Sequence, residues 1–313
     1  MAVIVESLEQ ANVAGPLHLA LGMFDGVHLG HQAVIESAVH SAHRTGGVAG
    51  VLTFDPHPST LFRPNDPTRL LQPRSVKEHL LRERGVALMI FQRFNTEFAS
   101  VAAENFPAML RQHLPSLRSL HIGENFRFGK GRIGDIRTLI QACQPLQIGV
   151  FSVERIKHNG EPISSTRIRQ SLKDGGIDDV NELLGYTYFS LGEAIPGRQL
   201  GRSIGFPTLN LRWAPELKPK LGVYAVRVRR DDDADGGKWE NAVANYGLRP
   251  TVENAAVEPL LEVHTLCDTE LTTGDELIVE WEHFIRPEQK FDSLDALKTQ
   301  IAKDKAEAVR YFS

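Results

Sequence analysis

Apolar and polar residues follow two different patterns along the chain. In the first part, five short apolar runs occupy residues 17–21, 48–54, 87–91, 117–122 and 148–153. Between them, apolar residues recur at helical spacing near residues 30–45, 75–84, 96–113 and 134–143. Strands that alternate with helices are typical of a parallel α/β sheet. Because ligands lie beyond the carboxyl ends of the strands in such sheets, the loops after the strands are the candidate site.

The pattern of apolar and polar residues changes after residue 185. Short alternating segments at 222–229, 242–245, 260–266 and 276–281, separated by turn residues, predict a small antiparallel β-barrel. The acidic run at 231–237 predicts a solvated hairpin tip. A last helix is expected to begin near Ser293 and to pack on the barrel through one apolar face, formed by Leu294, Leu297, Ile301, Val309 and Phe312. We therefore expect an α/β domain over residues 1–184 and an all-β domain over residues 185–313.

Composition narrows the class of protein. A chain of 313 residues exceeds what one hydrophobic core usually serves, which agrees with two domains. Its net charge of -4 and pI near 6.3 argue against nucleic acid as a partner. With only Cys143 and Cys267, the chain has neither a disulfide framework nor a thiolate zinc site, and we expect two buried thiols. No signal sequence or membrane-spanning run is seen, so we expect a cytoplasmic protein without membrane association; oligomeric state is not indicated.

The most informative motif covers residues 22–31, directly after the first apolar run. Gly22, Gly26 and Gly30 allow backbone amides to approach a ligand, and the new helix N-terminus adds partial positive charge there. His28 and His31 are three residues apart, which places both imidazoles on one face of a first helical turn, where they can donate to phosphate oxygens. The motif predicts nucleotidyl transfer. A pair of metal ligands, or two ordinary surface histidines, remain alternatives.

A second candidate phosphate site covers residues 163–169. Ser164, Ser165 and Thr166 stand at a predicted helix start, and Arg167 and Arg169 follow. Hydroxyl caps, free amides and guanidinium groups all favour phosphate. An ordinary capped helix is the alternative, and a serine nucleophile is disfavoured because no Gly-x-Ser-x-Gly turn surrounds these serines.

Together the two motifs resemble the two signatures of the nucleotidyltransferases whose fold is shared with class I aminoacyl-tRNA synthetases, and FAD synthetase most of all. The resemblance implies a Rossmann-like amino-terminal domain in which His28, His31, Ser164 and Arg169 are catalytic. Two further stretches, 54–58 and 123–129, fit that family after the second and fourth strands. The residues implied to bind substrate are Gly22, Phe24, Asp25, Gly26, Asp55, Asn125, Ser165 and Thr166.

Two features of the stretch after the fourth strand have competing interpretations. Phe126 and Phe128 can stack on a planar ring, although aromatic residues at this spacing more often belong partly to the core. Residues 129–134 spell Gly-x-Gly-x-x-Gly, with Glu154 about 20 residues further on, as in the dinucleotide-binding fingerprint. Because these glycines come several residues after the strand instead of forming its immediate turn, the dehydrogenase interpretation is disfavoured.

The barrel half begins with residues 197–210, a glycine- and arginine-rich loop that leads to Thr208 and Asn210. Amides and arginine suit a triphosphate, while the Thr hydroxyl and Asn oxygen suit Mg²⁺. This loop resembles the signature of riboflavin kinase, and the resemblance continues through residues 222–224, 245–251 and 284–291. It implies a base role for Glu262, whose alternative is a solvent-facing strand residue, and nucleotide contacts from Gly201, Arg202, Gly205, Thr208 and Asn210, with Mg²⁺ on the last two.

Two positions depart from the riboflavin kinase pattern. Leu209 replaces the customary alanine and is expected to add bulk beside the phosphate loop, and residues 270–274 lack the usual tyrosine. The resemblance still covers the whole chain and implies a bifunctional riboflavin kinase and FAD synthetase that uses ATP, riboflavin and FMN as substrates with Mg²⁺. A single-function FAD synthetase with a flavin-binding barrel is the nearest alternative. A non-catalytic flavin sensor and a transferase acting on pantetheine phosphate or nicotinate mononucleotide are more distant ones.

Overall fold

A computed structural model describes residues 2–197, 206–231, 237–248 and 259–313. By its contacts the chain forms two compact units, Met1–Ser165 and Thr166–Ser313. The domain boundary expected at residue 184/185 concerns the functional halves and stays a prediction. Among the described residues, no helix has the length and apolar character needed to cross a membrane.

The first unit is built on a parallel sheet of six strands in the order β1-β4-β3-β2-β5-β6. The apolar runs predicted these strands within a residue or two, except the short first one, and the sheet confirms the α/β class. The strands are β1 (Val3–Val5), β2 (Leu17–Leu21), β3 (Val48–Phe54), β4 (Leu88–Gln92), β5 (Leu117–Gly123) and β6 (Gly149–Val153). A separate two-stranded ribbon pairs β7 (Lys157–His158) with β8 (Glu161–Pro162).

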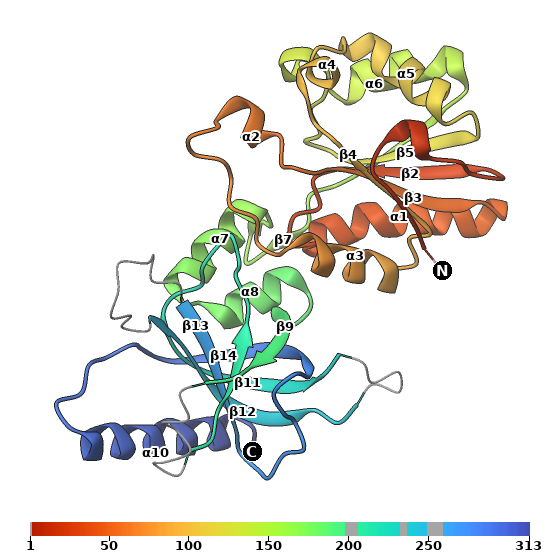
Figure 1. Ribbon diagram of the computed structural model, residues 1–313. Coiled ribbons are helices and arrows are strands. Elements are labelled where there is room, and N and C mark those ends of the chain that lie inside the picture. The colour runs from red at the N-terminus through yellow and green to blue at the C-terminus, as the bar shows by residue number, and fades with distance from the viewer. Residues whose placement is uncertain (1, 198–205, 232–236, 249–258) are drawn as a thin grey trace. The chain divides into compact units, whose positions relative to one another are not determined.

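Helices cover both faces of this sheet, with α1 and α3 on one side and α4, α5 and α6 on the other (Figure 1). Their bounds are α1 (Leu29–Thr45), α2 (Ser59–Phe62), α3 (Arg74–Glu83), α4 (Thr96–Ala99), α5 (Phe106–His113) and α6 (Ile136–Cys143). The core on the α5 and α6 side is formed by leucines of the strands together with Phe106, Leu110 and Leu139. Because β2 lies between β3 and β5, the loops after these three strands open at the same edge of the sheet.

One long helix expected over residues 96–113 is wrong. The chain instead forms α4, a short turn of 3₁₀-helix at Ala103–Asn105, and then α5. Ala102 is extended, with φ -63° and ψ 146°, and Pro107 lies in the first turn of α5. Because proline has no N–H to donate, the first turn of a new helix is the place where it costs no hydrogen bond.

The second unit contains a closed antiparallel barrel of six strands in the order β10-β13-β12-β11-β14-β9, which confirms the all-β prediction. Its elements are α7 (Ser165–Asp174), α8 (Ile177–Leu184), β9 (Phe189–Ile195), β10 (Leu209–Arg212), β11 (Gly222–Arg230), β12 (Glu240–Leu248), β13 (Pro259–Thr265), β14 (Glu276–Pro287) and α10 (Leu294–Tyr311). Four large aromatic residues, Tyr188, Tyr224, Tyr246 and Trp281, fill the barrel. Strands β11 and β12 pair as a hairpin. Its acidic tip was predicted at residues 231–237, of which 232–236 lie outside the described residues.

Helix α10 begins after Ser293, as predicted, and packs beside β11 and β12 (Figure 1). The predicted apolar face is wrong in part, because Leu294 and Val309 are exposed. The buried positions include Asp304, which pairs with Arg286 of β14. An ion pair thus adds to the contact of α10 with the barrel, which the prediction had described by apolar side chains alone.

The expectation of two buried thiols is also corrected. Cys143 is buried at the end of α6, whereas Cys267 is exposed. Cys267 follows β13 in a bend, and its carbonyl accepts a hydrogen bond from the Thr265 hydroxyl at 3.0 Å. A bend at the end of a strand leaves this side chain outside the core.

Candidate active sites

The loop after β2 has an unusual backbone. Phe24, Gly26 and Val27 adopt positive φ values of 47°, 78° and 37°. For residues with a β-carbon this region is costly, and it persists where the surroundings hold it in place. Phe24 and Val27 are fully buried, which supplies that constraint. A tight and rigid loop therefore joins β2 to α1 at the carboxyl edge of the sheet.

His28 and His31 lie together at the start of α1, as their spacing predicts. His28 is the N-cap residue, and its Nδ1 accepts a hydrogen bond from the His31 backbone N–H at 3.3 Å. The two rings are stacked, with centroids 3.6 Å apart and planes 15° from parallel. The Phe24 ring also contacts His31, edge-on, with ring centroids 5.4 Å apart. Both imidazoles thus stand beside the positive end of the helix dipole, a suitable place for phosphate.

The second motif meets the first loop through Ser165. The Ser165 hydroxyl donates to the Asp25 carbonyl oxygen at 3.0 Å, although the two residues are 140 positions apart. The Asp25 carboxylate is buried and accepts a hydrogen bond from the Leu71 N–H at 3.0 Å. Helix α7 begins at Ser165, as predicted, with Ser164 half-buried just before it. Thr166 is exposed and Arg169 half-buried on α7, in the second compact unit.

The loops after β3 and β5 contain the other predicted contacts. Asp55 is half-buried and pairs with Arg74 at 3.3 Å. Asn125 is exposed in the turn after β5. Phe128 is 6% exposed and packs against Phe106, with centroids 5.3 Å apart, so it belongs to the core. Phe126 is half-buried and stacked on Phe128 at 5.7 Å, so the stacking role on a ligand is not favoured for either ring.

The glycines of the Gly-x-Gly-x-x-Gly stretch allow this loop to pack closely against Ala103. It comes after the end of β5 at Gly123, and Phe128 pairs with Gly134 in an isolated antiparallel bridge. A β-carbon at Gly129 would lie 2.6 Å from the Ala103 Cα, and one at Gly134 would lie 2.8 Å from the Ala103 Cβ. These glycines let the loop approach a neighbouring segment closely, and the strand-turn-helix context of a dinucleotide site is not present in these residues.

In the barrel, strand register places three polar residues in one row. Asn210 of β10 lies opposite Glu262 of β13, and Glu262 lies opposite Asn245 of β12. Directly opposed residues of antiparallel strands share a face of the sheet. Glu262 is half-buried on the face opposite to Leu261 and Val263, whose side chains are buried. Asn245 begins the stretch 245–251 that resembles riboflavin kinase, but its position beside Glu262 follows only from strand pairing.

The predicted metal ligands differ in exposure. Asn210 is 4% exposed, whereas Thr208 is exposed just before β10.

His264 is buried, and its Nδ1 lies 2.7 Å from the carbonyl oxygen of Pro207, the residue before Thr208. Burial lowers the pKa of His264. This histidine fixes the end of the phosphate loop, a role that the sequence did not reveal.

Three predicted contacts of this loop, Gly201, Arg202 and Gly205, lie outside the described residues, as do residues 249–251. The expectation that Leu209 adds bulk beside this loop stays a prediction, because residues 198–205 lie outside the described residues. Leu209 pairs with Val263 and is half-buried, so it lies on the face opposite to Asn210. Its bulk therefore adds to the barrel side of β10. In the segment without tyrosine, the Thr272 N–H donates to Asp275 at 2.7 Å, which closes the turn before β14.

Comparison with known proteins supports the family resemblance of each half of the chain. The FAD synthetase family model matches residues 11–167, and the riboflavin kinase family model matches residues 184–312. The bifunctional riboflavin kinase/FMN adenylyltransferase of Bacillus subtilis is 37% identical over 300 residues, which cover 94% of this chain and 92% of the relative. That of Escherichia coli K12 is 37% identical over 310 residues, covering 98% and 96%. A crystal structure from Streptococcus pneumoniae, described as a macrolide-efflux protein, covers 97% of both chains with a TM-score of 0.86 and 27% identity.

Proposed function

Because the chain belongs to the family of bifunctional riboflavin kinases/FMN adenylyltransferases, we propose how its residues divide two reactions between two sites. The protein phosphorylates riboflavin to FMN with ATP and adenylylates FMN to FAD with release of pyrophosphate. The observation that carries this conclusion is the presence of both halves in one chain that matches its relatives over nearly their full length. We assign adenylyl transfer to residues 1–184 and the kinase to residues 185–313.

In adenylyl transfer, a phosphate oxygen of FMN forms a bond to the α-phosphorus of ATP. The bond between that phosphorus and the bridging oxygen breaks, and pyrophosphate leaves with the electron pair. We assign His28 and His31 to stabilise the charge that develops on these phosphates, because their stacked rings stand together at the N-terminus of α1. Ser164 and Arg169 are assigned to the same phosphates by their hydroxyl and guanidinium groups.

This step requires no covalent enzyme intermediate. The acceptor phosphate is already anionic, so alignment and charge neutralisation supply the catalysis. The rigid loop after β2 suits this role, with Gly22 and Gly26 offering backbone amides and the buried Phe24 and Asp25 fixing its shape. The further substrate contacts that we propose come from Asp55, Asn125, Ser165 and Thr166.

In the kinase reaction, the 5′-hydroxyl oxygen of riboflavin forms a bond to the γ-phosphorus of ATP. The bond between that phosphorus and the oxygen that bridges it to the β-phosphorus breaks, and ADP leaves with the electron pair. We propose that Glu262 accepts the hydroxyl proton. Its support is the half-buried carboxylate in a row with Asn210 and Asn245. Gly201, Arg202, Gly205 and Thr208 are assigned to the ATP phosphates.

The residues present fit a Mg²⁺ ion, a cofactor that both families typically use with ATP. The amide of Asn210 is buried beside a carboxylate, and the Thr208 hydroxyl is two residues away, a hard oxygen set of the kind that Mg²⁺ prefers. When bound there, Mg²⁺ neutralises charge on the ATP phosphates as the phosphoryl group moves. We further propose a cytoplasmic location, supported by the two cysteines, both of which are free.

The proposal is tested by incubating the protein with riboflavin, ATP and Mg²⁺, and separately with FMN, ATP and Mg²⁺, and then separating the flavins by chromatography. FAD in both mixtures is the expected result. FAD from FMN alone would favour the single-function FAD synthetase whose barrel binds flavin without phosphorylating it. Saturable flavin binding without ATP turnover in either mixture would contradict both enzyme functions.

A further inference from the structure

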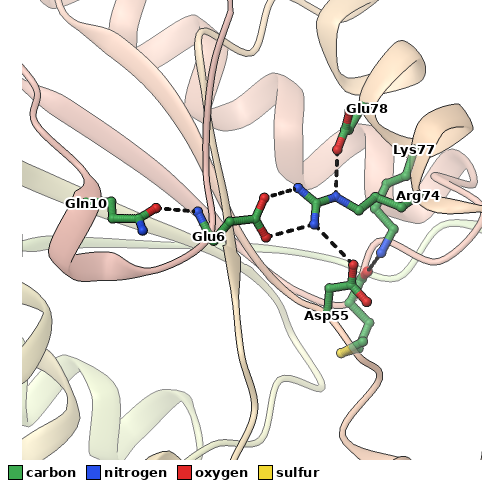
Figure 2. Close-up of polar contacts among 7 residues, drawn as sticks. Glu6, Gln10, Asp55, Arg74, Lys77 and Glu78 are labelled. Atoms are coloured by element: carbon green, nitrogen blue, oxygen red, sulfur yellow. Dashed lines mark hydrogen bonds and ion pairs between the residues drawn. The ribbon is translucent and has the colours of Figure 1, made fainter.

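A charged cluster around Arg74 lies at the carboxyl edge of the parallel sheet. Arg74 is the first residue of α3, and its guanidinium contacts three carboxylates (Figure 2). The Glu6 oxygens lie 2.6 and 2.9 Å from its two Nη atoms, and the Asp55 Oδ2 lies 3.3 Å from Nη1. Its Nε donates to Glu78 at 2.7 Å. One side chain thus links the residues that follow β1 and β3 to helix α3.

The cluster spans the ends of three neighbouring strands. Glu6 directly follows β1, and Asp55 directly follows β3. The strand between these two is β4, and the guanidinium carbon of Arg74 lies 4.0 Å from the centroid of the Phe91 ring on that strand. Cations are attracted to the face of an aromatic ring, so this contact adds to the ion pairs. The arrangement fixes Arg74 over the edge where a parallel sheet binds its ligand.

Residues 71–77, which end in the first turn of α3, also hold the loop after β2. The Lys77 ammonium donates to the Met23 carbonyl oxygen at 3.0 Å, and the Leu71 N–H donates to the Asp25 carboxylate at 3.0 Å. Lys77 is only 5% exposed. Residues 71–77 therefore contact both the rigid loop after β2 and the loop that begins at Asp55. Their contacts set the distance between the two loops.

The charges of the cluster make Arg74 hard to replace. Glu6, Asp55 and Glu78 would repel one another, and any phosphate that enters between the loops, if the guanidinium were absent. The Arg74 hydrogen bond lowers the pKa of Glu6, which agrees with an anionic carboxylate there. Lysine carries the same charge as arginine but lacks the planar fork that reaches several carboxylates at once.

We propose that Arg74 is a positioning residue for adenylyl transfer, which holds the loop beginning at Asp55 in the position that binds substrate. This inference rests on the proposed function of the amino-terminal unit. The side chain of Arg74 is 31% exposed, so its ion pairs alone contribute little to the stability of the unit. A residue that mainly positions a loop should alter substrate affinity more than folding.

The experiment compares Arg74→Met, Arg74→Lys and a matched control, Arg82→Met, in the full chain. Arg82 is an exposed arginine on the same helix. The KM values for FMN and ATP and the kcat of FAD formation are measured, and the riboflavin kinase rate of each sample serves as an internal standard. We expect Arg74→Met to raise the KM for FMN or ATP about tenfold, the equivalent of 1.4 kcal/mol, and Arg74→Lys to recover part of the loss. Arg82→Met should leave both constants unchanged.

Asp55→Asn alone provides a second measurement that does not depend on the folding of Arg74→Met, and its combination with Arg74→Met measures how far the two residues act together. If the two residues act as one unit, the KM of the double variant for FMN or ATP should be little higher than that of either single variant. An unchanged KM in Arg74→Met, with a maximal rate that falls in step with its folded fraction, would overturn the proposal and leave Arg74 a structural role. Additive losses in the double variant would overturn it too. A wild-type protein that turns FMN into no FAD would instead refute the function from which the inference starts.

Discussion

Replacing Asp304 with alanine should destabilise the barrel strongly, because it leaves Arg286 charged and without its partner. Arg286 of β14 donates to Asp304 of α10 through Nε at 2.8 Å and through Nη2 at 2.7 Å. Gln300 adds a third donor to the same carboxylate at 2.8 Å. The Asp304 side chain is 5% exposed and that of Arg286 is 17% exposed. The pair therefore fastens the terminal helix to the barrel from inside the protein.

The magnitude follows from this burial. Removal of one partner from a buried ion pair typically costs about 3–5 kcal/mol, and the partial exposure of Arg286 favours the lower end. A loss of about 3 kcal/mol should lower the unfolding midpoint of a unit of this size by roughly 10 °C. The double variant Arg286→Met with Asp304→Leu should recover most of this loss, because well-packed apolar residues can replace a buried ion pair.

The tryptophans give a direct assay. All three, Trp213, Trp239 and Trp281, lie in the second compact unit, so tryptophan fluorescence during heating reports on that unit alone. The riboflavin kinase of Asp304→Ala should be inactivated at lower temperature, while its conversion of FMN to FAD should keep the wild-type heat resistance. Both measurements are made on the full chain.

Glu307→Ala is the matched control on the same helix. Glu307 pairs with Arg310 at 3.6 Å, and its side chain is 50% exposed, so this variant should lose less than about 0.5 kcal/mol. If Asp304→Ala lowers the fluorescence midpoint no more than Glu307→Ala does, the argument from burial is refuted. If the double variant stays as unstable as Asp304→Ala, the loss comes from disturbed packing of α10 and not from the unpaired charge.

The remaining predictions concern the two sites and a buried histidine. His28→Ala and His31→Ala should each abolish FAD formation from FMN and leave FMN formation largely intact, as flavin chromatography would show; loss of both activities would mean that the two halves depend on each other. Glu262→Gln should stop FMN formation while supplied FMN is still converted to FAD, and an unchanged kinase rate would exclude Glu262 as the base. Burial lowers the pKa of His121 to about 4, well below the 6.5 of a free imidazole. The unfolded chain therefore takes up this proton first as the pH falls, so the stability of the amino-terminal unit should be complete above pH 6.5 and decline towards pH 4, by up to about 1.4 kcal/mol per pH unit. Unfolding followed by circular dichroism should show a flatter pH dependence in His121→Asn, and identical slopes would contradict the assignment.

Local patterns in the sequence were enough for much of the amino-terminal half. The strands at Leu17–Leu21 and Val48–Phe54 coincide with their apolar runs, because a strand buried on both faces needs apolar side chains at most of its positions. The stacking of His28 and His31 follows from their spacing on a helical turn. The break before α5 was missed although Pro107 signals it, because the apolar periodicity continues across the break.

The sequence by itself determined the two fold classes, the two phosphate motifs and the chemistry they support, since these depend on residues close together in the chain. The tertiary structure alone decided which distant residues share a site. The order of strands puts β2 between β3 and β5, and the barrel register puts Asn245 beside Glu262. Arg74 meets Glu6 across 68 positions, and Asp304 is buried because Arg286 lies opposite. Such contacts depend on the pairing of whole strands and helices, which no local period of polar and apolar residues encodes.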